Sequence, residues 1–317
     1  MLKFSVIIPA YNREPLIGTT LDSIFNQTLP PAEVIVVDDG STDRTAEIVS
    51  TWPKCTLIRS ENAGAAAARH KGVLASSGDW LAFCDSDDLW RPDHLASLAA
   101  ASRHVQEKGM VFSNFMRGDG QVWETATKFD TAPTDFWSKF KKIDATLSVA
   151  ETPIFQEVLR FQPIFQSCTA MSRPFYTKVG GYNGAFGRLP SEDLEFTLRC
   201  VRHAPIAATW EPTALIRRHA GNHSRDQMRQ LTGEVAILLH ARASMELAVS
   251  WREELDHQII VRSAEAIDAA FTQKRWETLT AMAKHVPWRH RSAKQIVKVL
   301  LSQVAGAFPG RDQRELG

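Results

Sequence analysis

Three carboxylates stand close together where an apolar run ends, in the stretch FCDSDD that begins at Phe83. Asp85, Asp87 and Asp88 have no Lys or Arg between them. Two like charges about 5 Å apart, at an effective dielectric constant of about 20, repel by roughly 3 kcal/mol. Asp85 and Asp87 flank Ser86, so in an extended chain both side chains point the same way and can converge on a cation or its water shell. The alternative is a solvated turn, because Asp and Ser are common turn residues.

The elements that position these acids follow from the apolar pattern. Short apolar runs predict buried strands, at 3–8, 34–37, 55–58 and 80–84. Helical patterns separate them, at 16–25, 41–52 and 62–76, and a further helix with Pro92 in its first turn is expected to end near Lys108. Strands that alternate with helices predict a doubly wound, mostly parallel α/β sheet. A second acidic pair, Asp38 and Asp39, also follows a strand, so both clusters are expected to face one crevice at the carboxyl edge.

Other parts of the chain are less regular. Ser41 and Ser191 are expected to cap helices, and the first turn after Ser191 holds Glu192 and Asp193, where the helix dipole favours negative charge. The stretch 117–165 matches no pattern that we can assign. From residue 228 onward the pattern is almost purely helical, which predicts a helical region at 228–317 appended to the sheet domain.

The composition of the 317 residues is that of a globular protein, with 44% apolar and 23% charged residues. The chain has 37 basic and 36 acidic residues, a balance that argues against nucleic acid as a partner. The cysteines are scattered and form no metal-binding spacing, so we expect reduced, mostly buried thiols in a cytoplasmic protein: Cys55, Cys84, Cys168 and Cys200. No apolar run is long enough to predict a signal peptide or a membrane span.

Common nucleotide and hydrolase motifs do not occur in the sequence. It has no GxxxxGK[ST] phosphate loop, no strand-to-helix GxGxxG, no HExxH and no GxSxG. If the crevice binds a nucleotide, phosphate charge must be balanced by another group. Mg²⁺ or Mn²⁺ suits that task, since carboxylate oxygens are preferred ligands of both.

Eight stretches, taken together and in this order, are similar to those of family 2 glycosyltransferases. They are SVIIPAYNRE, LDSIFNQT, EVIVVDDGSTDRT, ENAGAAAARHKGV, GDWLAFCDSDDLWRP, VGGYN, SEDLEF and RRHAGNHS, and they lie within about residues 3–225. The resemblance implies a GT-A fold, in which a Rossmann-like, mostly parallel open sheet is flanked by helices. It places the catalytic domain at 1–227, with nucleotide-sugar binding in 1–116 and the acceptor side in 117–227.

The resemblance also implies roles for single residues. Pro9, Tyr11 and Asp39 would hold the nucleobase and ribose, and Asp85 would lie near the ribose or in the outer shell of the metal. Asp87 would bind the metal directly, and His219 would complete the metal or diphosphate site. Further nucleotide contacts are implied for Glu14, Asn62, Gly64, Arg69 and Ser86. Alternative phosphate contacts are Arg217, Arg218 and His223.

Asp193 would be the general base. Simpler roles stay open for several of these residues: core packing for Tyr11, a surface ion pair for Arg69, stabilisation of a helix N-terminus for Asp193, and capping of the helix near Pro92 for Asp88.

The expected function is that of a metal-dependent, inverting hexosyltransferase. It would transfer a sugar from a nucleotide-diphospho-sugar, by family habit a UDP-sugar, to a hydroxyl of a cell-surface polysaccharide or lipid-linked glycan. The alternatives are a nucleotidyltransferase and a non-catalytic nucleotide-sugar binding protein. The apolar residues of 296–308, preceded by the basic stretch WRHR, suggest peripheral contact with the inner face of the membrane. The alternatives are that this helix packs against its own domain, or that the C-terminal helices form a homodimer.

Overall fold

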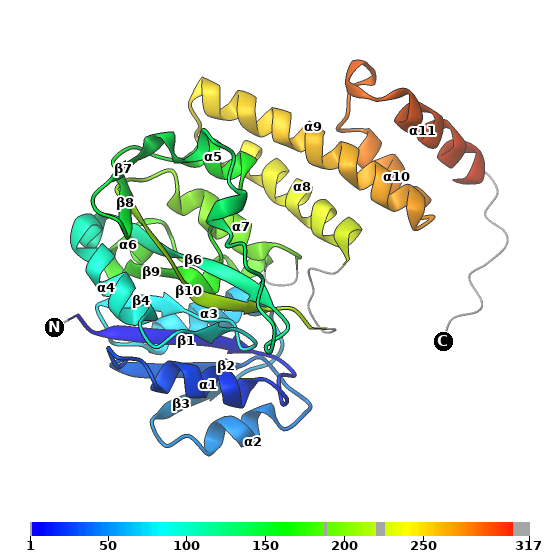
Figure 1. Ribbon diagram of the computed structural model, residues 1–317. Helices are drawn as coiled ribbons and strands as arrows, with labels where there is room; N and C mark the ends of the chain where they lie inside the picture. The colour runs from blue at the N-terminus through cyan, green and yellow to red at the C-terminus, as the bar shows by residue number, and fades with distance from the viewer. Residues whose placement is uncertain (1, 187–188, 220–225, 307–317) are drawn as a thin grey trace. The chain divides into compact units, whose positions relative to one another are not determined.

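The computed structural model describes residues 2–186, 189–219 and 226–306, and the chain divides into two compact units at residues 1–222 and 223–317. In the described part of the first unit the strands form one mixed sheet in the order β3-β2-β1-β4-β9-β6-β10-β8-β7, with β5 paired to β10. The strands are β1 Phe4–Ala10, β2 Glu33–Asp38, β3 Cys55–Arg59, β4 Trp80–Phe83, β5 Leu89–Trp90, β6 Met110–Gly118, β7 Phe140–Lys142, β8 Leu147–Ala150, β9 Thr169–Ser172 and β10 Ile206–Arg217. Helices flank this sheet, so the predicted α/β class is confirmed (Figure 1).

The parallel part of the sheet contains the four strands that the apolar runs predict. β1 pairs with β2 and β4, and β2 pairs with β3, all in parallel. Beyond β4 the sheet becomes mixed, because β9 lies antiparallel between β4 and β6. β6 and β10 are again parallel, so the carboxyl ends of these two strands lie at one edge of the sheet.

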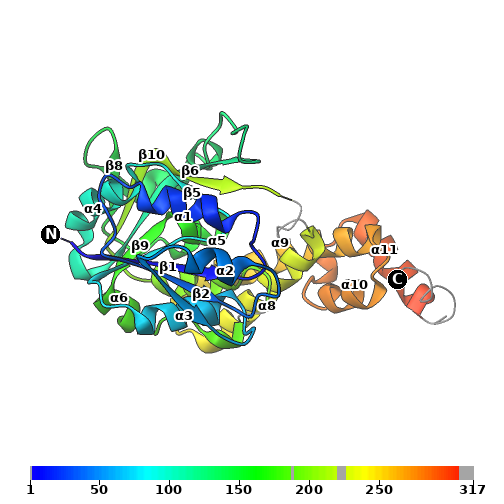
Figure 2. The same ribbon diagram turned by 90° about the horizontal axis from the view of Figure 1, so that it is seen from below.

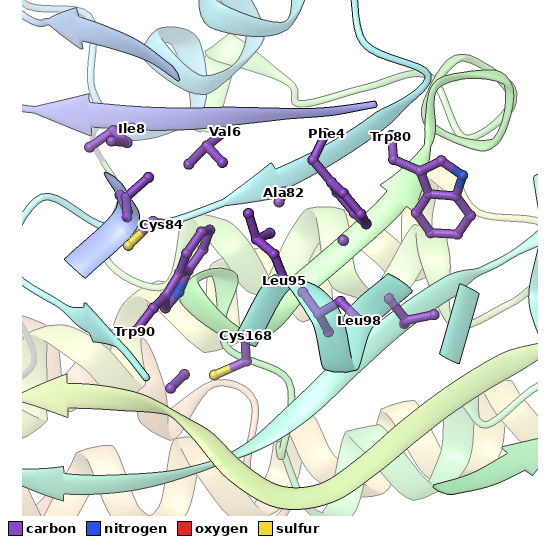
Figure 3. Close-up of a cluster of buried hydrophobic side chains, with 14 of the residues drawn as sticks. Phe4, Val6, Ile8, Trp80, Ala82, Cys84, Trp90, Leu95, Leu98 and Cys168 are labelled. Carbon is purple, nitrogen blue, oxygen red and sulfur yellow. The ribbon is translucent and has the colours of Figure 1, made fainter. Parts of the chain in front are cut away.

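Helices cover both faces of the sheet (Figures 1 and 2). The bounds are α1 Ile17–Phe25, α2 Thr45–Ser50, α3 Ala65–Ala75, α4 His94–Val105, α5 Phe155–Arg160, α6 Arg173–Lys178 and α7 Glu192–Cys200. On one face, β-strand residues such as Val6 and Ile8 pack with Leu95 and Leu98 of α4 (Figure 3). On the other face α3 approaches β1 so closely that a Cβ on Gly72 would lie 2.6 Å from Ile7 Cγ2. The strands are therefore covered on both sides, which explains why they read as continuous apolar runs.

Three local expectations are wrong. Ser41 does not cap α2, which begins at Thr45; its Oγ instead accepts a hydrogen bond from the Asn12 N–H at 2.9 Å, while Asp43 Oδ1 accepts from the Thr45 N–H at 3.0 Å. Ser191 precedes α7 in the left-handed region, with φ +63°, and its side chain makes no capping bond. Pro92 stands two residues before α4 rather than in the first turn of the helix. It lies in the segment that connects β5 to α4.

The stretch 117–165, which the sequence leaves unassigned, contains the end of β6, the β7–β8 hairpin and α5, joined by 3₁₀ turns. Its aromatic residues pack on one another: Phe129 lies 4.5 Å from Trp137 and 5.5 Å from Trp210 between ring centroids. Such a cluster leaves no periodic pattern in the sequence, since its members come from short irregular segments.

The second unit is helical as expected, with α8 Gln227–Ser244, α9 Val249–Thr272, α10 Trp276–Ala283 and α11 Ala293–Gly306. Its core joins α9, α10 and α11 through residues that include Ile267, Leu279 and Val299. Among the described residues no helix has both the length and the apolar character needed to cross a bilayer. All four cysteines are free thiols, and three of them are buried, as predicted.

Candidate nucleotide and metal site

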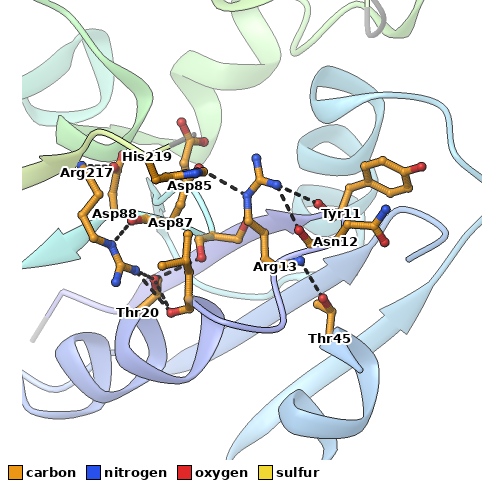
Figure 4. Close-up of polar contacts among 12 residues, drawn as sticks. Tyr11, Asn12, Arg13, Thr20, Thr45, Asp85, Asp87, Asp88, Arg217 and His219 are labelled. Atoms are coloured by element: carbon orange, nitrogen blue, oxygen red, sulfur yellow. Dashed lines mark hydrogen bonds and ion pairs between the residues drawn. The ribbon is translucent and has the colours of Figure 1, made fainter. Parts of the chain in front are cut away.

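The acidic stretch after β4 contains one carboxylate with a structural role. Asp88 is buried, and its Oδ2 accepts from Ser167 Oγ at 2.5 Å. Its Oδ1 accepts from the Arg217 N–H at 3.0 Å (Figure 4). Burial, followed by the charges of Asp87 and Asp85, raises the pKa of Asp88 well above its ordinary value. The expectation that Asp88 caps the following helix is wrong, because its side chain joins the loop to β10 and to the turn before β9.

Asp87, the predicted metal ligand, lies beside His219, the second predicted ligand. Asp87 Oδ2 is 2.9 Å from His219 Nε2 and 3.2 Å from Arg13 Nε (Figure 4). Burial opposes ionisation of this carboxyl, but the hydrogen bond with His219 and the charge of Arg13 hold its pKa below the ordinary value. The structure thus brings together an ionised carboxylate and an imidazole, a donor set that suits Mn²⁺ or Mg²⁺ with further oxygen ligands. No cluster of three metal-ligating side chains occurs among the described residues.

Arg217 holds the acidic loop against α1. Its guanidinium donates to the carbonyl oxygen of Asp87, to Thr19 Oγ1 at 2.7 Å and to Thr20 Oγ1 at 2.8 Å (Figure 4). The suggestion that Arg217 contacts phosphate therefore gives way to a role in positioning the loop. Arg218 is exposed and ion-pairs with Glu124 at 2.7 Å. The third alternative, His223, lies outside the described residues.

Arg69 joins the acidic loop to the start of α7. Only 3% of its side chain is exposed; NH2 lies 2.6 Å from Asp85 Oδ1 and NH1 lies 2.9 Å from Glu192 Oε1. Burial alone would lower the pKa of Arg69, but the carboxylates, Asp85 first, raise it well above the ordinary value. The alternative of a surface ion pair for Arg69 is wrong. Asp193, the predicted base, is half-buried and follows Glu192 directly, so Arg69 ties the predicted base to the predicted metal loop.

The predicted nucleoside contacts lie at the carboxyl ends of β1 and β2. Tyr11 is 41% exposed just after β1, which excludes core packing, whereas Pro9 is buried within the strand. Asp39 accepts from the Ala63 N–H at 2.9 Å and the Gly64 N–H at 2.7 Å, a turn in which Gly64 has φ +90°. A cavity of about 320 Å³ is lined here by Asp39, Ser60, Glu61, Ala63, Ala67, Ala68 and Lys71. The contact of Asp39 with a nucleobase stays a prediction.

The other predicted contacts are arranged around this edge with different environments. Asn62 directly precedes Ala63 in the same turn. Glu14 Oε2 accepts from the Arg44 N–H at 3.2 Å, so this carboxylate joins two loops of the edge. Ser86 is buried, and its carbonyl oxygen accepts from Thr20 Oγ1 at 3.1 Å.

Sequence reasoning missed several residues of the site. Arg13 pairs with Asp87 although it carries no expected role, and it lies inside the stretch PAYNRE that the resemblance had already singled out. Ser167 accepts from the Asp85 N–H at 2.9 Å and donates to Asp88, but nothing in the surrounding FQSCT marks it. Only the tertiary packing of the turn before β9 places Ser167 at the acidic loop.

The mixed sheet with an acidic loop after β4 is the GT-A fold of glycosyltransferases. TarS 1-349 of S. aureus, solved in complex with UDP-GlcNAc, is similar to 95% of this chain and 89% of that chain, with a TM-score of 0.63 and 19% identity. Mannosyltransferase PcManGT from Pyrobaculum calidifontis, solved with GDP-Man and Mn²⁺, matches 97% of this chain and 81% of that chain with a TM-score of 0.57 and 19% identity.

Sequence comparison points to the same class of protein. The model of Glycosyl transferase family 2 matches residues 5–155 of this chain. The succinoglycan biosynthesis protein ExoW of Rhizobium meliloti (strain 1021) is 30% identical over 211 residues, 63% of this chain and 64% of ExoW. The putative teichuronic acid biosynthesis glycosyltransferase TuaG of Bacillus subtilis (strain 168) is 42% identical over 96 residues, 29% of this chain and 38% of TuaG. The chain thus spans less than two thirds of each of these relatives.

Proposed function

We propose that the protein transfers a sugar, with inversion, from a nucleotide-diphospho-sugar to a hydroxyl of a glycan acceptor. The contact of Asp87 with His219 at 2.9 Å, at the carboxyl edge of a GT-A sheet, is the observation that carries this proposal. The match of residues 5–155 to the model of Glycosyl transferase family 2 supports the reaction class. The complex of TarS with UDP-GlcNAc supports a UDP-sugar as donor, and the name of ExoW supports a polysaccharide as product.

Asp87 and His219 would hold a divalent cation, and the chemistry of this donor set fits Mn²⁺ or Mg²⁺. When bound, the cation would supply Lewis-acid stabilisation of the charge that develops on the departing diphosphate. The protein itself prepares the site: Arg217 fixes the backbone of Asp87, and Arg13 together with His219 keeps its carboxylate ionised. The acidic loop therefore keeps its shape and charge through contacts with three other segments.

On the acceptor side, Asp193 would accept the proton of the attacking hydroxyl. Positioned general bases typically contribute about 10²- to 10⁴-fold to a rate. The ion pairs of Arg69 with Glu192 and Asp85 would fix the start of α7 relative to the loop that faces the donor. In a single displacement with this base, an α-linked donor gives a β-linked product.

The helices of the second unit bear on where in the cell the protein acts. We propose that the C-terminal helices keep the enzyme at the cytoplasmic face of a membrane, because Trp288, Val297, Leu300 and Leu301 are exposed and no acid occurs between Glu277 and Asp312. The alternative, a homodimer through these helices, is distinguished by flotation with anionic liposomes. A form that lacks 288–317 but floats equally well would contradict the membrane contact.

Thermal unfolding in the presence of nucleotides tests the central proposal. A ligand at 100 times its Kd stabilises a protein by about 2.7 kcal/mol, which amounts to several degrees for a domain of this size. We expect UDP to raise the Tm strongly with Mn²⁺ and weakly without it, and Asp87→Asn to remove the metal-dependent part.

Asp79→Asn is the matched control, because Asp79 is exposed and precedes β4, at the opposite end of the strand from the acidic loop. It should behave as the unchanged protein does. If no nucleotide diphosphate or nucleotide-sugar raises the Tm in a metal-dependent way, the proposed function is wrong.

A further inference from the structure

Two cations at the end of β6 lie on aromatic rings instead of beside carboxylates. Arg117 Cζ is 5.4 Å from the ring centroids of both Phe115 and Phe165, and Lys128 Nζ is 4.0 Å from that of Phe161. Both side chains are half-buried. Within the described residues, neither charged group has a hydrogen bond or ion pair with a carboxylate. This environment differs from that of Arg13 and Arg69, which each face an acid.

The two cations belong to one cluster of like charge. The Lys128 N–H donates to the Phe115 carbonyl oxygen at 2.9 Å, which fixes Lys128 beside the strand that carries Arg117. Burial and then the charge of Arg117 lower the pKa of Lys128 to about 8. Burial and then the charge of Arg218 lower the pKa of Arg117. Among the described residues, the carboxylate whose charge acts on Arg117 is that of Glu124, which is already ion-paired with Arg218.

The cluster lies at the carboxyl edge of the sheet, on the side away from β1 and β2. Arg117 is the cross-strand neighbour of Ile216, and the next residue of that strand, Arg217, holds Asp88. Phe165, under the Arg117 guanidinium, is two residues before Ser167, which also bonds Asp88. In the sheet order, β9 separates β6 from β4, whereas the predicted nucleoside contacts follow β1 and β2. A group bound here would lie beside the acidic loop but on the acceptor half.

We propose that Arg117 and Lys128 bind an anionic group, a phosphate or a carboxylate, on the sugar acceptor. Aromatic faces hold the cations in place without neutralising them, so an incoming anion gains two unpaired partners in a partly desolvated position. The inference rests on the proposed sugar transfer and adds the chemical class of the acceptor. The anion could be a phosphate that links the acceptor to a lipid or polyol, or the carboxylate of a uronic acid.

Titration of the 317-residue chain, saturated with UDP and Mg²⁺, tests the inference with three probes: glucose 1-phosphate, glucuronate and glucose. The bound UDP occupies the diphosphate site, so that the probes report on the acceptor half. We expect at least one anion to bind about tenfold or more tightly than glucose, the range of one charge-assisted hydrogen bond. Tighter binding of glucose 1-phosphate than of glucuronate indicates a phosphate-linked acceptor. Tighter binding of glucuronate indicates a uronic acid in the acceptor.

The variant Arg117→Met with Lys128→Met should lose this preference while its affinity for glucose and UDP stays unchanged. Lys128→Met alone should lose part of it, which provides a second variant if the double one is unstable. Lys142→Met is the matched control, since Lys142 is exposed on β7. Equal binding of the anions and glucose, or a preference that survives in the double variant, would overturn the inference. If UDP fails to stabilise the protein, the nucleoside diphosphate that does so takes its place in the titration, and if none does, the proposed function fails instead.

Discussion

The carboxyl edge of the sheet has a donor half, at the ends of β1, β2 and β4, and an acceptor half, at the end of β6 and in the segments up to residue 165. The two halves hold their cations in opposite ways. In the donor half, Arg13 and Arg69 lie against carboxylates, and Arg69 is almost fully buried between two of them. In the acceptor half, Arg117 and Lys128 lie against rings. A buried cation between two acids is a fixed part of the fold, because removal of one partner leaves a buried charge uncompensated. A cation on a ring keeps its charge available. The comparison leads us to propose that the donor half is organised before substrate binds, whereas the acceptor half completes its charge balance with the substrate.

Asp193→Asn is expected to have the largest effect, because it should lower the rate of sugar transfer without changing donor binding. Loss of the general base should lower the rate of sugar transfer by about 10²- to 10⁴-fold. The increase in Tm with UDP and Mn²⁺ should persist, because the predicted donor contacts lie on other elements. Steady-state transfer and thermal unfolding on the same preparations measure both quantities.

Asp79→Asn again serves as the control and should keep full activity. If Asp193→Asn abolishes the stabilisation by UDP, Asp193 belongs to the donor half. If it leaves transfer unchanged, its carboxylate only stabilises the N-terminus of α7. If neither the variant nor the unchanged protein transfers sugar, the protein binds nucleotide-sugars without catalysis.

The same division appears in how well the sequence predicts each half. The donor half consists of apolar strands followed by polar residues at fixed short spacing, so the strands near 4–10, 33–38 and 80–83 and the residues at their ends can be predicted from the chain alone. Asp87 and His219 lie far apart in sequence, and only the family resemblance anticipates that they meet. The acceptor half consists of irregular segments within 119–165 whose aromatic residues meet from different turns. Ser167 and Lys128 gain their environments from that packing, which local patterns do not encode.

A second, smaller effect is expected in the free energies of unfolding of the variants Arg69→Met and Arg117→Met. Removal of Arg69 leaves Glu192 and Asp85 without their shared partner, and we expect the free energy of unfolding to fall by about 3 kcal/mol, the lower part of the range for a broken buried ion pair because Asp85 has some access to solvent. Met in place of Arg117 keeps the contacts with Phe115 and Phe165 and removes the repulsion between Arg117 and Arg218. The free energy of unfolding should therefore change by no more than about 0.5 kcal/mol.

Urea unfolding of the two variants, each compared with the unchanged protein, measures this difference in stability. Equal losses of stability would mean that Arg117 is as much a part of the folded framework as Arg69. The contrast between the two halves would then fail, although the donor site itself would be unaffected.

The smallest effect is expected at the border between the halves, where Ser167 joins the turn before β9 to the acidic loop. Ser167→Ala removes the hydrogen bond to buried Asp88 and the acceptor for the Asp85 N–H. An unsatisfied buried partner typically costs about 1–3 kcal/mol, and we expect a loss of about 1–2 kcal/mol in urea unfolding together with weaker metal-dependent stabilisation by UDP. Ser102→Ala is the control, since Ser102 is equally buried but its hydroxyl bonds only to the Ala99 carbonyl oxygen within α4. If Ser167→Ala changes neither stability nor the response to metal, Asp88 is held by Arg217 alone, and the acceptor half does not support the geometry of the donor half.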